Sequence, residues 1–450
     1  MFGLGFYQYV PYGVYVFSFM IALLALFYRN EIGIFFVAFF LPIYAVLFRV
    51  IHLELPFSKD IIDMIVIAML LGWLFQGHKT AEKEMIASPL LKTILIFMGY
   101  TFFSFLVGSL NLESGIFSDV NSQRLAVWKN YMIMPILYLI TYYNLKDRRW
   151  QYAFFIMLFF SFLAMSYKFK TTFRWYEHTH YMDESRLGGT FAFLGPNEWG
   201  SFQAIYTLFI IGLFLVDKNF WRRIAYLILI YSCTYSLMYS FSRGAYFGFL
   251  VGLLFIGFIR SKKLLIPLVI FLLIWKSILP LSVVERIEGT FLEEAEGTEV
   301  VSIGETHVST AGRSHLWDKA VDIFSENPIV GKGFNTYQRL TEWDTHSTYL
   351  KTLAEQGIIG FILYLGLYLF ALRSGWRLYR NGDEDLSKAL GFAFLCAVVG
   401  SIVVNIFGDR WTYLQSGGLY WIFWALVDQE NSRIKMEKGE MTASLEERSA

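Results

Sequence analysis

Residues 388–407 read KALGFAFLCAVVGSIVVNIF, and the only charged residue in this stretch is the first. A helix needs about 20 apolar residues to cross the roughly 30 Å hydrocarbon core of a bilayer, so the stretch predicts a membrane-spanning helix. Similar runs recur from residue 12 to residue 428. The chain of 450 residues is 56% hydrophobic and 17% charged, whereas soluble domains carry about 25% charged residues. The composition therefore predicts an all-α, polytopic integral membrane protein.

The apolar runs predict twelve or thirteen transmembrane helices in one domain, residues 1–430, followed by a polar tail, residues 431–450. No basic residue precedes the first run and no small-residue cleavage pattern follows it, so we expect that run to stay in the membrane. The predicted spans are residues 12–28, 32–51, 61–75, 89–108, 126–142, 151–167, 197–216, 224–241, 244–259, 264–280, 347–370, 388–407 and 411–427.

Basic residues gather in four connectors that are separated by two spans each. They are Lys146, Arg148 and Arg149; Lys218, Arg222 and Arg223; Arg260, Lys262 and Lys263; and Arg373, Arg377 and Arg380. Because Lys and Arg concentrate in cytoplasmic loops, we place these connectors and the C-terminal tail in the cytoplasm. The segments 168–190 and 281–345, and the turns at 242–243 and 409–410, then face the periplasm or exterior. The side of the N-terminus stays open.

The outward segment 281–345 is too long and too polar to be a simple connector. Its first part is acidic, with Glu285, Glu288, Glu293, Glu294, Glu296 and Glu299. Its later part, Ser314 to Glu326, has apolar residues at helical spacing and is followed by Asn327 and Pro328, which predicts a short amphipathic helix. We expect any chemistry to be located in this extracytoplasmic loop.

Several function classes find no support in the sequence. The net charge of +1 gives no reason to expect a nucleic-acid partner. No glycine-rich nucleotide loop and no nucleophile elbow occurs. Glu177, His178 and His180 match no closed zinc pattern, so we expect no metal. The two cysteines, Cys233 and Cys396, lie inside apolar runs and are predicted to be buried hydrophobic residues.

Three arginines in the outward segments are candidate ligands for an anion. Arg243 lies in a turn between two apolar runs, where a cation either faces a cavity with an anionic partner or extends to lipid headgroups. Arg313 opens the predicted amphipathic helix, so its guanidinium and the free N–H groups of the helix start suit phosphate oxygens. Arg186 lies in a loop beside glycines. For Arg313 and Arg186, a solvated surface charge is the alternative.

Two further candidate residues are His346, which immediately precedes the span 347–370, and Glu355, which lies within it. His346 lies at its start, with Asp344 or Thr345 as the expected N-cap, and a helix N-terminus favours the neutral imidazole that a general base requires. An inert interfacial histidine is the alternative. Glu355 lies deeper in the same span, and Lys351, four residues earlier, is its nearest candidate partner.

The candidate residues lie in three stretches that follow one another in a fixed order. They are RLGGTFAFLGPNEWG at 186–200, SFSRGAYFGFL at 240–250, and GRSHLWDKAVDIFSENPIVGKGFNTYQ at 312–338 followed by HSTYLKTLAEQGIIGFILYLGLYL at 346–369. Together they resemble the O-antigen ligase and O-antigen polymerase superfamily of bacterial membrane glycosyltransferases. The resemblance covers roughly residues 180–375.

This resemblance implies transfer of a glycan from an undecaprenyl-diphosphate carrier to an acceptor hydroxyl, at the outer face of the bacterial cytoplasmic membrane. It implies that Arg186, Arg243 and Arg313 bind the diphosphate and that His346 is the catalytic base, with Asn197 and Glu355 in weaker supporting roles. It implies neither a metal nor another cofactor. The partners would be the lipid-linked donor, a glycan or lipid-linked acceptor, such as a lipid A core sugar or a growing polysaccharide, and membrane lipids.

The sequence does not choose between a ligase and a polymerase, and it leaves the sugar and acceptor open. A flippase or transporter of a lipid-linked saccharide is the alternative from another class. Transporters commonly show two related halves with broken helices in corresponding places, and neither the symmetry nor the paired breaks are evident here.

Overall fold

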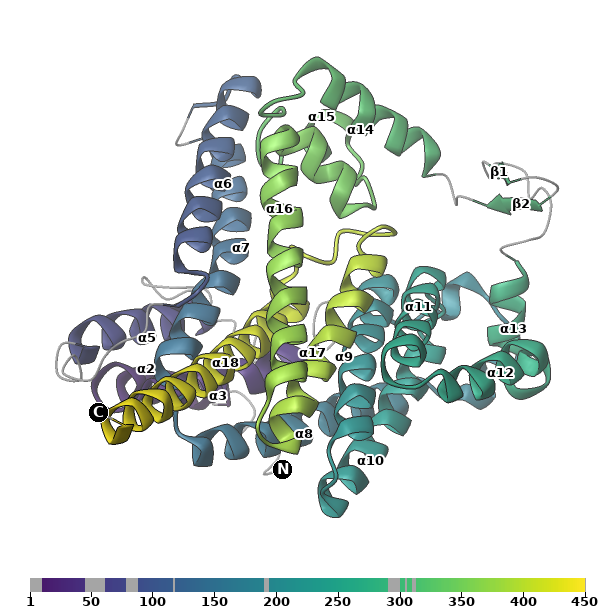
Figure 1. Cartoon of the computed structure of the whole chain (residues 1–450). Helices are drawn as coiled ribbons and strands as arrows, with labels where there is room; N and C mark the ends of the chain where they lie inside the picture. The colour runs from purple at the N-terminus through teal and green to yellow at the C-terminus, as the bar shows by residue number, and fades with distance from the viewer. Residues whose placement is uncertain are drawn as a thin grey trace, which may run out of the picture.

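The structure, a computed structural model, describes residues 10–44, 61–77, 88–115, 118–189, 194–289, 300–303, 306–309 and 313–449. Long helices make up nearly all of this part (Figure 1). Helices occupy all or part of each predicted span; residues 45–51 of the second lie outside the described residues. These helices are α2 (Val10–Phe27), α3 (Asn30–Phe40), α5 (Ile61–Gly77), α6 (Leu91–Asn111), α7 (Asp119–Asn144), α8 (Arg148–Thr172), α9 (Pro196–Val216), α10 (Phe220–Met238), α11 (Arg243–Arg260), α12 (Leu265–Ile278), α16 (Thr348–Asn381), α17 (Asp385–Val404) and α18 (Leu414–Ser449).

The helices confirm the predicted polytopic, all-α membrane fold. Within the described residues, six of them are long and apolar enough to cross a membrane by themselves: α6, α8, α9, α11, α16 and α17. The first three predicted spans form shorter apolar helices. The last helix, α18, runs on without interruption through most of the segment predicted as a polar tail.

Helices α9 and α17 form the centre of the molecule. About 83% of the apolar window of each is buried, compared with 28–39% for the other four long apolar helices. Close packing between them requires a small residue, because a Cβ atom at Gly212 would lie 2.5 Å from Cα of Ala393. The N-terminal end of α9 and the C-terminal end of α17 lie next to the segments that the charge pattern places outside.

The span predicted at 264–280 does not continue straight into the outer loop. Helix α12 ends at Ile278, and after Pro280 the chain forms a second, short helix, α13 (Leu281–Glu288). The two helices are bent by 109° relative to one another. The predicted loop therefore starts with a helix, and this helix carries Glu285 and Arg286.

The outer segment also contains the hairpin of β1 (Val300–Ile303) and β2 (Thr306–Ser309), and the helices α14 (Ser314–Glu326) and α15 (Tyr337–Thr341). Helix α14 has the predicted bounds and buries Leu316 and Ala320, so the amphipathic helix is confirmed. Helices α14 and α15 lie beside the first part of α16 (Figure 1). The acidic residues Glu293, Glu294, Glu296 and Glu299 lie outside the described residues.

Helix α16 is interrupted at Gly357, which has φ +61° and ψ −164°. The preceding loop pairs with this break: Ile358 N–H donates to the Pro328 carbonyl at 2.9 Å, and Gly333 N–H donates to the Glu355 carbonyl at 2.7 Å. A Cβ atom on Gly357 would lie 2.3 Å from the Ile329 carbonyl oxygen. Glycine is therefore needed here both for the backbone angles and for the close contact. The break fixes the outer loop onto the membrane domain.

Candidate active site

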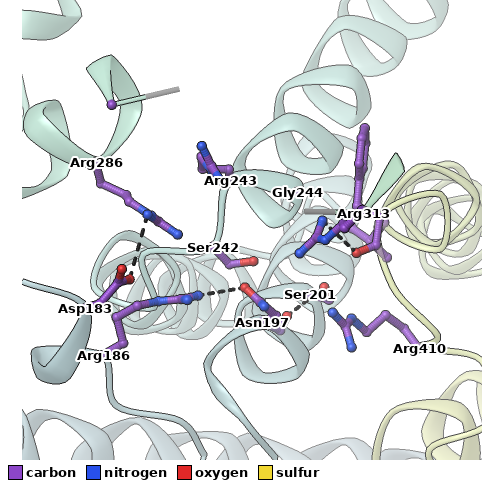
Figure 2. A pocket seen from close by; sticks show the side chains of 13 residues that line it. Asp183, Arg186, Asn197, Ser201, Ser242, Arg243, Gly244, Arg286, Arg313 and Arg410 are labelled. Atoms are coloured by element: carbon purple, nitrogen blue, oxygen red, sulfur yellow. Dashed lines mark hydrogen bonds and ion pairs between the residues drawn. The ribbon is translucent and has the colours of Figure 1, made fainter. Parts of the chain in front are cut away.

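A cavity of about 340 Å³ opens among the outward turns, and its lining is mostly polar or charged (Figure 2). This volume lies within the range of about 300–1,000 Å³ that is usual for small-molecule sites. The lining residues are Asp183, Arg186, Asn197, Ser201, Ser242, Arg243, Gly244, Arg286, Gly289, Arg313, Val404, Phe407 and Arg410.

Five of the lining residues are arginines, and each comes from a different element. They are Arg186 from the loop before α9, Arg243 from the first position of α11, Arg286 from α13, Arg313 from the start of α14 and Arg410 from the loop between α17 and α18. The three arginines predicted from sequence are thus brought together. Such a concentration of guanidinium groups suits a polyanion such as a diphosphate.

The turn before α11 positions Arg243. Phe241 has φ +51° and a fully buried side chain, and Ser242 is the N-cap of the helix. A bulky residue in the left-handed region is uncommon, and such strain concentrates at functional sites. The turn packs closely on α9, because a Cβ atom on Gly200 would lie 2.7 Å from Cβ of Ser242. Arg243 is therefore held at the cavity by a constrained turn.

Arg186 is oriented by Asn197. Its guanidinium donates to the Asn197 side-chain oxygen at 2.7 Å, and its Nε–H is buried without a hydrogen-bond partner in the part of the chain that the structure describes. Burial, together with the nearby Arg286, lowers the pKa of Arg186. Asn197 thus lines the cavity and orients an arginine. Its supporting role stays a prediction.

Arg313 is the N-cap residue of α14, as the predicted helix start requires. Its guanidinium donates to the Phe407 carbonyl at 3.4 Å. Burial lowers its pKa to about 10, with further contributions from Arg410, Arg243 and other cavity arginines. The arginines therefore repel one another in the structure, which an anion bound between them would relieve.

Sequence reasoning missed Arg286. Its Nε–H donates to the Phe241 carbonyl at 3.1 Å, its guanidinium lies 4.7 Å from the Tyr181 ring centroid, and its NH1 is 3.9 Å from Asp183 Oδ1. The neighbouring Glu285 accepts from the Tyr181 N–H at 2.7 Å. The loop that carries Arg186 is therefore fastened to α13. The signal in the sequence was one arginine within an otherwise acidic segment.

Arg410 was placed outside by the charge pattern but was not assigned to the site. Its side chain is 4% exposed and forms an ion pair with Glu198. Its Nε–H has no hydrogen-bond partner among the described residues, and its backbone N–H donates to the Asn405 side chain at 3.0 Å. The sequence could not have shown that this turn closes over α9, because the two segments are far apart along the chain.

His346 lies outside the lining of the cavity, in the loop before α16. The expected N-cap was wrong: the helix begins at Thr348 with Ser347 as N-cap, so His346 lies before the helix with φ +52°. Its Nδ1 is 3.9 Å from Asp344 Oδ2. Burial lowers the pKa of His346, Asp344 opposes this effect, and Arg313 adds to it. The imidazole is therefore neutral near pH 7, as a general base requires.

Hydrogen bonds connect the His346 loop to two parts of the cavity wall. Trp317 Nε1–H of α14 donates to the Thr345 carbonyl at 3.1 Å. Thr348 N–H donates to the Asn405 carbonyl at 3.0 Å, and its hydroxyl donates to the Asn405 side-chain oxygen at 2.6 Å. The loop is therefore fixed both to the helix that begins at Arg313 and to the turn that carries Arg410.

The spacing of Glu355 and Lys351 predicted that they pair, and this prediction was wrong. The carboxylate accepts from the backbone N–H groups of Asn335 and Tyr337 at 2.8 and 3.0 Å, whereas Lys351 Nζ lies 2.8 Å from Asp409 Oδ2. Backbone donors compensate a buried carboxylate well. Glu355 therefore orders the loop after α14 and does not line the arginine cavity.

Glu177, His178 and His180 have separate contacts. His180 Nδ1 lies 2.8 Å from Glu285 Oε1, the His178 ring stacks on Phe173 at 4.7 Å, and Glu177 pairs with Arg174. His180 therefore belongs to the contact between the Arg186 loop and α13.

Comparison with known proteins gives one family. Residues 224–365 match the family model described as O-antigen ligase. No curated protein matches the chain. The matched segment contains Arg243, Arg286, Arg313 and His346. It supports a role in the transfer of polysaccharide or lipopolysaccharide-type glycans by a multi-pass membrane protein. The predicted resemblance to the O-antigen ligase and polymerase superfamily is therefore confirmed by the match at residues 224–365.

Proposed function

We propose that this protein transfers a glycan from an undecaprenyl-diphosphate carrier to an acceptor hydroxyl, without a metal, at the outer face of the bacterial cytoplasmic membrane. The observation that carries the proposal is the cavity to which five elements each contribute an arginine. A diphosphate supplies the matching charge and oxygen acceptors, and bidentate guanidinium contacts are the strong form of such recognition.

In the proposed reaction, the acceptor oxygen forms a bond to the sugar anomeric carbon while the bond from that carbon to the diphosphate oxygen breaks. The electron pair of the broken bond stays on the diphosphate. Arg186, Arg243 and Arg313 stabilise the charge that develops there, which is commonly the largest catalytic contribution. His346 takes the proton of the acceptor hydroxyl, and its lowered pKa keeps it available for this step.

The face of the membrane follows from the charge pattern. The cavity is built from turns and loops that alternate with the basic connectors, which are typical of the cytoplasmic side. A carrier diphosphate lies at the headgroup level of a bilayer, where the loop ends of the spans are located. These observations support a periplasmic or exterior location for the proposed chemistry.

The proposal is tested with the purified full chain in liposomes, an undecaprenyl-diphosphate-linked oligosaccharide and a panel of acceptors, with and without EDTA. We expect transfer that resists EDTA. His346→Ala should lower the rate by about 10² to 10⁴-fold, the usual contribution of a general base. His315→Ala, at an exposed position on α14, is the matched control and should keep the wild-type rate.

A different outcome would redirect the assignment. Absence of transfer to every acceptor, combined with movement of the lipid-linked saccharide across the bilayer that His346→Ala leaves unchanged, would identify a flippase. Loss of transfer with EDTA that added Mg²⁺ restores would contradict the metal-independent mechanism.

A further inference from the structure

The cavity holds a surplus of positive charge among the residues that the structure describes. Five arginines line it, and the only carboxylate in the described lining is Asp183. Outside the lining, Glu198 pairs with Arg410. Arg186 and Arg313 both have lowered pKa values, to which Arg286 contributes. Mutual repulsion of this kind is relieved in proportion to the negative charge of the bound group.

The proposed reaction changes that negative charge. In the glycan-linked donor, each phosphate has one ester bond and one anhydride bond and carries one negative charge. In the released carrier the terminal phosphate keeps only the anhydride bond and gains a second ionisable oxygen. It then carries about 1.5 to 2 negative charges at pH 7, as a phosphate with a second pKa of about 6 does. The leaving group is therefore the more highly charged ligand. A cavity with surplus positive charge therefore binds the leaving group more tightly than the donor.

Arg286 is well placed to sense this difference. Its side chain is 16% exposed, whereas its carboxylate partner Asp183 is 75% exposed and 3.9 Å away, so the pair is loose. Its Nε–H is fixed by the Phe241 carbonyl and its guanidinium plane by the Tyr181 ring. Figure 2 shows the side chain on the same side of the cavity as Arg186 and Asp183. A partly buried guanidinium held in this way is preorganised for a phosphate oxygen.

We infer that the cavity binds the released polyprenyl diphosphate more tightly than the glycan-linked donor, and that Arg286 is a further ligand of this leaving group. The inference rests on the proposed function. The protein is then inhibited by its own product, and sustained turnover requires a reaction that removes the terminal phosphate from the released carrier.

The test compares the affinities of the purified full chain in detergent for three probes: undecaprenyl diphosphate, undecaprenyl monophosphate and undecaprenyl diphosphate linked to one sugar. We expect free diphosphate to bind about tenfold more tightly than the sugar-linked probe at pH 7.5, as one additional charge contact implies. The preference should shrink at pH 5.5, where the terminal phosphate loses most of its second charge. The monophosphate should bind more weakly than the free diphosphate.

Variants assign the preference to Arg286. Arg286→Gln should bring the affinities for the two diphosphate probes within about threefold of each other, whereas Arg286→Lys should keep most of the preference because the charge remains. Arg174→Gln, at an exposed position paired with Glu177, is the matched control and should behave as wild type. Thermal midpoints that match wild type exclude misfolding, and rescue by Lys distinguishes a ligand from a packing role.

The outcomes separate the inference from the proposed function. Transfer activity with equal affinity for the two diphosphate probes, or with a preference that Arg286→Gln leaves intact, overturns the inference and leaves the function standing. Failure to bind any probe, together with absence of transfer, overturns both.

Discussion

Arg124 and the arginines of the cavity are buried in different ways. Arg124, on α7, is fully buried and directs all three guanidinium nitrogens to protein oxygens: the carbonyls of Phe334 and Phe105 and the side chains of Ser109 and Asn121. By contrast, the Nε–H groups of Arg186 and Arg410 are buried without a partner.

We propose that this difference separates the structural arginine from the arginines that bind a ligand. A charge whose donors all meet protein acceptors is already compensated, and it holds segments together. Arg124 fixes the loop after α14 to α6 and α7 through Phe334. An arginine that keeps an unmet donor beside other arginines is compensated only in part, and a bound anion would complete the compensation. Burial alone would not have separated the two kinds.

Loss of a cavity arginine should produce the largest change, and the change should be confined to activity. Arg313→Ala removes a group that stabilises the leaving diphosphate, so we expect glycan transfer to fall by about 10² to 10³-fold, with a thermal midpoint close to wild type. Steady-state transfer assays and thermal unfolding in detergent measure both. A large drop in the midpoint would place Arg313 with Arg124 among the structural arginines.

Loss of Arg124 should instead lower the stability of the protein. Arg124→Met leaves the Phe334 carbonyl without the guanidinium that donates to it. It also removes one donor from the Phe105 carbonyl, which still accepts from the Ser109 hydroxyl. We therefore expect a loss of about 3 kcal/mol in the free energy of unfolding. The expected readout is a lower thermal midpoint and a lower yield of folded protein. Equal stability with a defect in donor affinity would show that Arg124 acts at the substrate site and would break the comparison.

Loss of Glu355 should also lower stability, but by a smaller amount than loss of Arg124. Glu355→Ala removes the acceptor for the N–H groups of Asn335 and Tyr337 and should cost about 1 to 3 kcal/mol of stability. Glu355→Gln keeps one side-chain oxygen and should cost less. If thermal unfolding is unchanged in both variants while transfer is lost, Glu355 has a catalytic role that the geometry does not indicate.

The pH dependence of glycan transfer should be the smallest of these effects. It should arise from His346 beside the cavity and not from Arg124. Because the pKa of His346 is lowered, the base is neutral at pH 7 and is lost only as pH falls through that pKa, below the usual value of 6.5. Transfer should then decrease about tenfold per pH unit. Asp344→Asn removes the carboxylate that opposes the shift, so the decrease should begin at lower pH. A pH profile that Asp344→Asn leaves unmoved would argue against His346 as the base.

Much of the fold could be predicted from the sequence because membrane spans are determined locally. A run of about 20 apolar residues must form a helix in lipid, where every backbone N–H and C=O has to be satisfied within the segment. For the same reason, the amphipathic helix at Ser314–Glu326 could be recognised from its own periodicity. The three predicted arginines lie in sequence stretches that carry the family resemblance, and each stretch can be recognised along the chain without the fold.

The tertiary structure alone decided which other residues complete the site and which partner each charge takes. Arg286 and Arg410 join the cavity only because α13 turns back after Pro280 and the turn after α17 closes over α9. Lys351 pairs with Asp409 instead of Glu355, four residues away on the same helix, because a loop brings backbone donors to that carboxylate. Hydropathy and periodicity describe each helix by itself, whereas the charge balance of a cavity depends on contacts between segments distant in the chain, and these contacts are formed only on folding.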